Sequence, residues 1–396
     1  MSKPVHSLGI HIYVQHLLGA GHLVRMKALA AALGRAGHRV TLISGGVSDG
    51  PRDGGYAFVQ LPEVKVAAGD FSALLGRDGR PVSEEFKARR AEQLLQRVRA
   101  DSPRVLVVET FPFGRRSLRF ELVPLMQMVG DMKPRPLRLC SLRDILQLRT
   151  LERHRQTVAE VNAWFDHVLV HADPGVATLA ETFPLAGELD GGVFHSGYLH
   201  AGGDCRGGPS TTQGRGEVIV STGGGAVGLG LLETAIAARR YSELQDRPWR
   251  LLVGGHLAAT GFDALQNRAG GGITVERNRS DFAALLSACA VSVSQAGYNT
   301  VLDTVAAGCR SVLVPFSRHG ETEQTQRAEK IAGLGRAVVL AEKDLNPRRL
   351  AAAVDRAAHL DLSKCRPIRM DGARQTIRFI ELIERRFTRR HCTQRP

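Results

Sequence analysis

Three side chains in the first half of the chain have the chemistry of a general base. His22 ends the turn Gly19–His22, which follows an apolar run and precedes a helical pattern. The positive end of a helix dipole disfavours an imidazolium ion, so a histidine at this place stays neutral and can accept a proton. Glu109 and Asp144 each follow a later apolar run and are the alternative bases. A histidine that only caps its helix is the structural alternative.

Arginines accompany both acids. Arg115 and Arg116 follow Glu109 within one loop, and Arg143 directly precedes Asp144. We expect these guanidinium groups to bind an anionic acceptor, because guanidinium forms paired hydrogen bonds to phosphate or carboxylate. The alternative is that Arg143 and Asp144 pair only with structural neighbours.

The second half of the chain contains a segment suited to a nucleoside diphosphate. Ala290–Val293 predicts a buried strand, and Thr300–Ala307 predicts a helix. Between them stands Gly297, whose missing side chain lets a ligand approach the backbone. The free N–H groups at the start of the helix attract phosphate. One turn into the helix, Asp303 would accept hydrogen bonds from a ribose or sugar hydroxyl.

A second glycine turn opens the same half. Gly223, Gly224 and Gly225 follow an apolar strand at residues 217–221, although a glycine triplet is often only a tight turn. We expect this turn and residues 298–300 to stabilise a leaving diphosphate through backbone N–H groups and the helix dipole. The chain contains no Asp-x-Asp motif, which would hold a metal on the diphosphate. We therefore expect a reaction without metal or other cofactor.

These segments resemble the donor-binding half of the family 28 glycosyltransferases, which include the bacterial enzymes that add N-acetylglucosamine to the lipid-linked peptidoglycan precursor. The resemblance rests on Ser294–Asp303, Val314–Phe316 and the pair Glu323-Gln324. Asp303 stands where the relatives usually carry Glu, and Asn278 replaces a usual aromatic. By this resemblance the donor-binding residues are Gly21, Gly223, Gly224, Gly225, Asn278, Gly297, Tyr298, Asn299, Thr300, Asp303, Glu323 and Gln324.

The first half also resembles this family. The turn before His22 is similar to the family turn that faces the acceptor and the donor phosphates, which favours His22 as the base. Residues 109–116, 141–144 and 195–198 resemble a bacterial subgroup of predicted family 28-like glycosyltransferases. The likeness covers nearly the whole chain but brings no established acceptor.

The elements that must position these residues alternate between apolar strands and helical stretches. This alternation predicts an α/β fold of parallel sheets with helices on both faces. We expect GT-B architecture, in which two doubly wound, Rossmann-like domains face a cleft. The predicted parts are an acceptor-binding domain (1–200), a linker (201–216), a nucleotide-sugar-binding domain (217–364) and a C-terminal helix (365–396) that packs back on the first domain.

The amino-acid composition indicates the cellular compartment of the protein. The chain has 396 residues, of which 43% are hydrophobic and 23% charged, as in a water-soluble protein of two domains. It has no apolar run long enough for a transmembrane helix and no pattern of a secretory signal. Its six cysteines are scattered without metal-ligand spacing, which predicts reduced thiols in the cytoplasm.

The net charge of +14 has two interpretations. Residues 104–149 hold nine Lys or Arg against four acids, and residues 365–396 hold nine Arg against three. These excesses are either solvated faces or a basic surface for an anionic partner, such as the inner face of a membrane or a phosphorylated, lipid-linked acceptor. Nucleic acid is disfavoured, because aromatic residues are only 5% and do not interleave with the basic clusters.

Together these features predict an inverting, metal-independent glycosyltransferase. It would move a sugar, N-acetylglucosamine by default, from a nucleoside-diphosphate sugar to an unidentified hydroxyl acceptor. UDP is the expected nucleotide, and dTDP is the alternative. Two other functions stay open: a nucleotide-sugar hydrolase or 2-epimerase of the same fold, and a non-catalytic protein that binds sugar nucleotides or a membrane surface.

Overall fold

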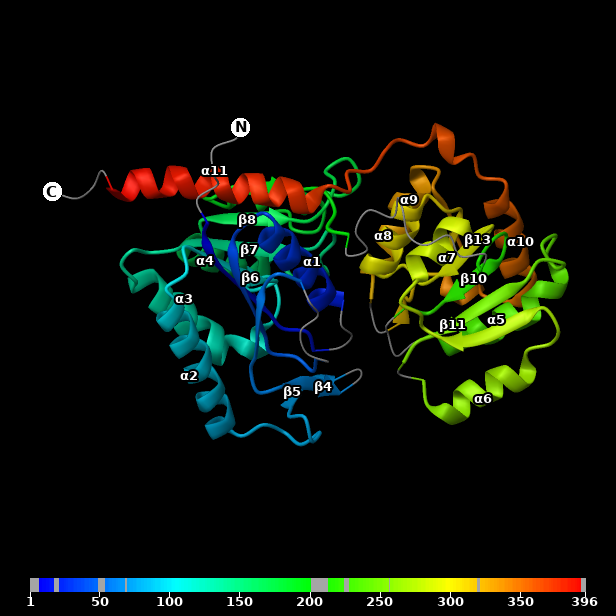
Figure 1. The fold of residues 1–396 in the computed structure, drawn as a ribbon, viewed down its shortest axis with the longest axis horizontal. Helices are drawn as coiled ribbons and strands as arrows, with labels where there is room; N and C mark the ends of the chain where they lie inside the picture. Colours follow the sequence, from blue (N-terminus) through cyan, green and yellow to red (C-terminus); the bar gives the residue numbers. More distant parts are fainter. Residues whose placement is uncertain are drawn as a thin grey trace. The chain divides into compact units, whose positions relative to one another are not determined.

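The protein consists of two compact units (Figure 1). Unit 1 comprises Met1–Ala201 and Arg369–Pro396, and unit 2 comprises Gly202–Ile368. The structure is a computed structural model that describes residues 7–17, 21–48, 54–67, 70–200, 213–223, 228–255, 257–318 and 321–392.

The sheet of unit 1 has seven strands in the order β3-β2-β1-β6-β7-β8-β9, and every neighbouring pair is parallel. Its strands are β1 (Gly9–Val14), β2 (Arg39–Ser44), β3 (Ala57–Gln60), β6 (Val105–Glu109), β7 (Leu137–Leu142), β8 (His167–Val170) and β9 (Val193–His195). The short strands β4 (Lys65–Ala67) and β5 (Asp70–Leu75) form a separate antiparallel pair. The central strands are apolar on both faces, as a parallel sheet covered by helices requires.

Two helices of unit 1 start at residues whose side chains cap them. The Ser83 hydroxyl accepts a hydrogen bond from the N–H group of Phe86 at the start of α2, and Thr150 caps α4 in the same way. The helices are α1 (Gly21–Arg35), α2 (Glu84–Asp101), α3 (Arg119–Asp131), α4 (Leu151–Trp164) and α11 (Gly372–Cys392), with short 3₁₀ turns at Arg116–Leu118, Leu179–Glu181 and Ala186–Glu188.

The last helix completes the core of unit 1. Ile380 of α11 is fully buried in the apolar cluster formed with β1 and α1. The chain enters this helix through a polar anchor, because the Asp173 carboxylate accepts a hydrogen bond of 2.9 Å from the N–H group of Arg369. Farther along, the guanidinium group of Arg104 lies 2.6 Å from the carboxylate of Glu384.

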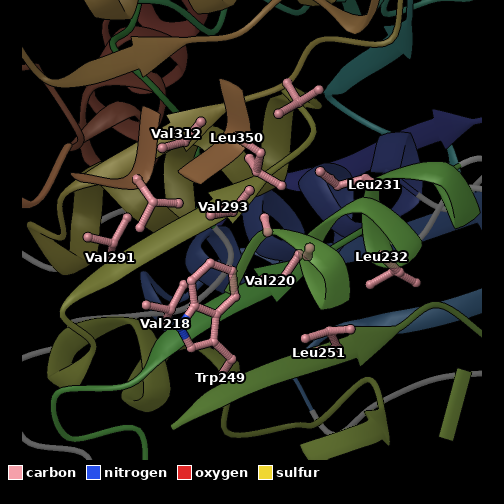
Figure 2. Packing of buried hydrophobic residues seen from close by; sticks show 14 of the residues in the cluster. Val218, Val220, Leu231, Leu232, Trp249, Leu251, Val291, Val293, Val312 and Leu350 are labelled. Atoms are coloured by element: carbon pink, nitrogen blue, oxygen red, sulfur yellow. The ribbon is translucent and has the colours of Figure 1, made fainter. Parts of the chain in front are cut away.

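Unit 2 has a parallel sheet of six strands in the order β12-β11-β10-β13-β14-β15. Its strands are β10 (Val218–Ser221), β11 (Trp249–Val253), β12 (Ile273–Arg277), β13 (Val291–Ser294), β14 (Ser311–Leu313) and β15 (Ala337–Val339). Its helices are α5 (Leu229–Ala238), α6 (Ala259–Arg268), α7 (Phe282–Ala288), α8 (Tyr298–Ala307), α9 (Glu323–Gly333) and α10 (Pro347–Ala358), with 3₁₀ turns at Arg239–Tyr241, Glu342–Asp344 and Leu362–Lys364. Figure 2 shows its core, where valines of β10 and β13 pack with Trp249 and Leu350.

Both sheets reverse their strand order at one point. In unit 1 the reversal lies between β1 and β6, and in unit 2 it lies between β10 and β13. Ligands of such sheets bind at the carboxyl ends of the strands beside the reversal. These two places are therefore the first at which a site is expected.

The structure confirms the predicted α/β fold with two doubly wound parallel sheets. Strands β3 and β9 were not predicted. They have only four and three residues, which are too few to show an alternation of apolar and polar side chains. Among the described residues, no helix is long and apolar enough to cross a membrane. Of the predicted linker, residues 201–212 lie outside the described part of the chain.

Candidate active site

The carboxyl edge of the unit 1 sheet brings His22 and Glu109 into contact. Glu109 is the last residue of β6, and His22 is the second residue of α1, which follows the neighbouring strand β1. The Nδ1 atom of His22 lies 2.6 Å from the Oε1 atom of Glu109. An ionised carboxylate only accepts hydrogen bonds, so Nδ1 is the donor in this pair. Nε2 is then the nitrogen that can accept a proton.

The surroundings keep this pair as a neutral imidazole beside an ionised carboxylate. Burial lowers the pKa of His22 from 6.5 to about 3, with help from Arg115 and Arg143 and against the attraction of Glu109. Burial alone would raise the pKa of Glu109, but His22, Arg25 and Arg115 hold it well below its ordinary value. Arg25 forms a buried ion pair with Glu109. The glutamate thus fixes the imidazole orientation and can stabilise the imidazolium that forms after proton transfer.

Two of the predicted acceptor-binding arginines belong to this cluster. Arg115 is half-buried, and its Nε atom donates a hydrogen bond of 2.7 Å to the carbonyl oxygen of Gln15. Arg143 follows β7 and is close enough to depress the pKa of His22. Arg116 instead begins a 3₁₀ turn, and its guanidinium group lies 3.3 Å from the side-chain oxygen of Gln156.

Asp144 follows β7 at the same edge of the sheet. Its side chain is almost fully buried, and its Oδ1 atom accepts a hydrogen bond of 2.9 Å from the N–H group of Ile145. The imidazole of His22 contacts the carboxylate of Glu109. The hydrogen bond of Asp144 comes from the backbone of the next residue.

Three residues of this cluster were not assigned a role from the sequence. Arg25 lies one turn after His22 on the same helix, and that spacing was the available signal. Thr110 donates a hydrogen bond of 2.6 Å to Oε1 of Glu109. His171 is fully buried after β8, with ring nitrogens 2.9 Å from the hydroxyl oxygens of Ser141 and Ser196. Nothing in the local pattern around Thr110 or His171 distinguishes them from structural residues.

In unit 2, the start of α8 is where the sequence predicts the diphosphate to bind. Gly297 precedes the helix, and no side chain caps the helix there. Its φ of −62° suits any residue, and a Cβ atom added to it would meet no described atom within 4 Å. Among the described residues, neither the backbone nor the packing requires glycine at this position. Asn299, Thr300 and Asp303 are half-buried in the first turns of α8.

Predicted donor residues from other elements meet this helix. Gly223 follows β10 with a φ of 64°, and a Cβ atom there would lie 3.2 Å from the hydroxyl oxygen of Thr300. Its carbonyl oxygen accepts a hydrogen bond of 3.2 Å from the side chain of Asn278. The reversal between β10 and β13 therefore gathers Gly223, Asn278 and Thr300. Gly224 and Gly225 lie outside the described residues.

The remaining predicted donor residues have other surroundings. The Glu323 carboxylate accepts a hydrogen bond of 2.6 Å from Arg327, whose guanidinium group also lies 5.7 Å above the ring of Tyr298. The side-chain oxygen of Gln324 accepts a hydrogen bond of 3.2 Å from the N–H group of Phe316. These contacts support the loops that follow β13 and β14. Gly21 is the first residue of α1 and belongs to unit 1.

A cavity of about 440 Å³ adjoins the same edge of unit 2. Its walls come from the first turns of α5 and from the loops after β13, β14 and β15, including Gln295, Phe316, Arg318 and Glu342. A cavity of this volume is within the range of small-ligand sites. Within the described ranges, no group of three or more His, Cys, Asp or Glu side chains is placed to hold a metal ion.

Known glycosyltransferases resemble this chain in part of the sequence and in the fold. Residues 262–385 match the glycosyltransferase family 28 C-terminal domain. One relative is the UDP-N-acetylglucosamine–N-acetylmuramyl-(pentapeptide) pyrophosphoryl-undecaprenol N-acetylglucosamine transferase of Xanthomonas axonopodis pv. citri (strain 306). It is 34% identical over 139 residues, which are 34% of this chain and 32% of the relative. The chain thus matches about a third of the length of its curated relatives.

Solved structures extend the likeness to nearly the whole chain. A calicheamicin glycosyltransferase has a TM-score of 0.60 at 16% identity, with 95% of each chain covered. MurG of Acinetobacter baumannii has a TM-score of 0.57 at 14% identity, covering 95% of this chain and 99% of its own. At such identities the likeness concerns the fold. The chain therefore has the two-domain fold of these glycosyltransferases, and its residues 262–385 are similar to the family 28 C-terminal domain.

Proposed function

We propose that this protein transfers a sugar from a nucleoside-diphosphate sugar to a hydroxyl group of an acceptor, with inversion at the anomeric carbon. The observation that carries the proposal is the contact between His22 and Glu109 at the sheet reversal of unit 1. A neutral imidazole oriented by an ionised carboxylate is the arrangement that activates a hydroxyl nucleophile.

The donor is assigned to unit 2. The N-terminus of α8 suits a diphosphate, since the helix dipole favours negative charge at this end of a helix. We propose that Asp303, one turn later, accepts hydrogen bonds from the ribose. A UDP-linked sugar, with N-acetylglucosamine as the default, follows from the donor in the name of the Xanthomonas relative. A dTDP-linked sugar is the second candidate.

The proposed reaction is a direct displacement. Nε2 of His22 accepts the proton of the acceptor hydroxyl group. At the same time, the oxygen of that hydroxyl group forms a bond to the anomeric carbon of the donor sugar. The bond from that carbon to the diphosphate oxygen breaks, and the nucleoside diphosphate leaves with the electron pair. We propose that backbone N–H groups near Gly223 and Gly297 stabilise the leaving group, so that no metal is needed.

The acceptor is assigned to unit 1. Arg115 and Arg143 place positive charge beside the base, which favours an acceptor with an anionic group near the reacting hydroxyl. A phosphorylated, lipid-linked acceptor meets this requirement. It would bring the protein to the inner face of the membrane as a peripheral cytoplasmic enzyme.

The test begins with thermal unfolding in the presence of UDP, dTDP, GDP, ADP or CDP, with EDTA and then with magnesium. Only a ligand that prefers the folded state raises the midpoint. We expect a selective shift with UDP or dTDP in EDTA, followed by release of that nucleotide from its sugar donor only when an acceptor is added. Release without an acceptor would indicate the hydrolase or 2-epimerase, and binding without turnover would indicate the non-catalytic protein. No shift with any nucleotide would refute the donor site.

A further inference from the structure

The backbone of the residue that follows Glu109 has an uncommon conformation. Thr110 has a φ of 67°, a region that a β-branched side chain rarely adopts. The N–H group of Phe111 donates a hydrogen bond of 2.9 Å to the carbonyl oxygen of Glu109, which closes a three-residue γ-turn around Thr110. The γ-turn with a positive φ is rare and strained. Such strain persists only where the surrounding structure enforces it.

The surrounding structure does enforce it. The N–H group of Thr110 donates to the carbonyl oxygen of Ser141 on β7, at 2.8 Å, and its own carbonyl oxygen accepts from the N–H group of Gly114, at 2.9 Å. A Cβ atom added to Gly114 would lie 2.9 Å from the methyl carbon of Thr110. The loop therefore leaves room for the threonine methyl group by having glycine there.

The turn directs the threonine hydroxyl at the catalytic pair. Oγ1 of Thr110 lies 2.6 Å from Oε1 of Glu109, the same oxygen that accepts the hydrogen bond from Nδ1 of His22. A γ-turn that served only to reverse the chain would be satisfied by glycine, without strain. The observed residue supplies a hydroxyl donor instead.

We infer that Thr110 is a positioning residue, whose hydroxyl group holds the Glu109 carboxylate in the place from which it orients His22. The effect of Thr110 on catalysis rests on the proposed function, because Thr110 acts on the base His22 only through Glu109. Its structural meaning, the fixed contact between Glu109 and His22, does not depend on which reaction the protein performs.

The test compares Thr110→Val, which keeps the branched shape and loses the hydroxyl, with Thr110→Ser, which keeps the hydroxyl. The full chain is labelled with ¹⁵N-histidine, and the Nδ1 proton of His22 is assigned by its loss in His22→Gln. We expect this proton to exchange faster and shift in Thr110→Val, and to resemble wild type in Thr110→Ser. Turnover should fall about 10- to 100-fold in the valine variant with unchanged UDP affinity, because misplacing a catalytic group costs rate rather than donor binding.

An unchanged Nδ1 resonance in Thr110→Val would overturn the inference, as would equal effects of valine and serine. The resonance also separates this inference from the proposed function. If it responds as expected while the wild-type protein releases no nucleotide with any acceptor, then the positioning role stands and the proposed transferase reaction fails.

Discussion

Nδ1 of His22 and Oε1 of Glu109 lie 2.6 Å apart, although 87 positions separate the two residues in the chain. Replacing the carboxylate tests what this contact does. In Glu109→Gln the amide keeps the shape but loses the negative charge that stabilises an imidazolium. We expect kcat to fall on the order of 100-fold or more, with little change in UDP affinity. Steady-state kinetics and calorimetric titration with UDP would measure the two effects.

The matched control for that variant is Glu121→Gln. Glu121 is also fully buried and also paired with an arginine, Arg90, in the same unit. Both variants lose a buried ion pair and should lose similar stability. Only Glu109→Gln should lose most of its turnover. If the two variants lose turnover equally, the carboxylate of Glu109 serves stability rather than the reaction.

Removing the imidazole should be equally informative. We expect His22→Ala to lower kcat on the order of 100-fold or more and to leave UDP affinity nearly intact, because a general base acts in the reaction step. Added imidazole should restore part of the turnover by occupying the vacated space. A parallel loss of nucleotide binding would instead make His22 a phosphate ligand.

Asp303 is the residue assigned to the ribose. We expect Asp303→Asn to weaken UDP binding about 10-fold or more, since a hydrogen bond to a charged group contributes about 1.5 to 3 kcal/mol. Asp263→Asn, at an exposed position of α6 in the same unit, is the control and should bind UDP normally. Calorimetric titration that gives equal affinities for the two variants would remove Asp303 from the site.

A steric probe can test whether a ligand approaches Gly297. Valine at this position meets open space in the protein, so Gly297→Val should fold with a nearly unchanged melting temperature. It should nevertheless lose UDP binding, because its side chain would occupy the space assigned to the diphosphate. Gly270→Val is the matched control, since Gly270 also faces open space with no special φ. Undiminished UDP binding by Gly297→Val would place the diphosphate elsewhere.

Two buried histidines predict how stability depends on pH. Burial lowers the pKa of His22 and that of His171 from 6.5 to about 3. Between these values the unfolded chain binds more protons than the folded protein, so the free energy of unfolding should fall as the pH is lowered through this range. Each histidine adds a slope of up to about 1.4 kcal/mol per pH unit.

Urea unfolding across this pH range would measure the slope. His171→Gln keeps a polar side chain between Ser141 and Ser196 but no longer titrates, so its slope should be shallower than that of wild type. The same slope in both proteins would show that His171 is not held neutral by burial.

The fold was predictable because its signals are local. An apolar run such as Val105–Val108 predicts a strand from its own residues, and the apolar spacing after His22 predicts a helix in the same way. The alternation of such strands and helices indicates parallel sheets. Positions at strand ends were also predictable, which is why Glu109 and Asp144 were both candidates. The choice between them was not. It depends on which side chain turns toward α1, and this is decided by packing and by the conformation of the loop after each strand.

The roles of Thr110 and Glu323 show the same limit. A positive φ at threonine has no sequence signal, because the residue is a poor choice for that conformation by itself. Glu323 is expected in the donor site by resemblance, and the sequence did not show that its carboxylate also pairs with Arg327 on the same helix. Such side-chain contacts can be identified only when the position of the whole helix or loop is known.

The burial of Ile380 in the core of unit 1 has a consequence for the order in which the protein is made. All of Gly202–Ile368 is synthesised before α11. At translation rates of about 5 to 20 residues per second, the apolar surface that α11 will cover waits on the order of 10 s. Unit 2 can finish folding in that interval, while the nascent unit 1 still exposes the apolar surface that α11 will cover.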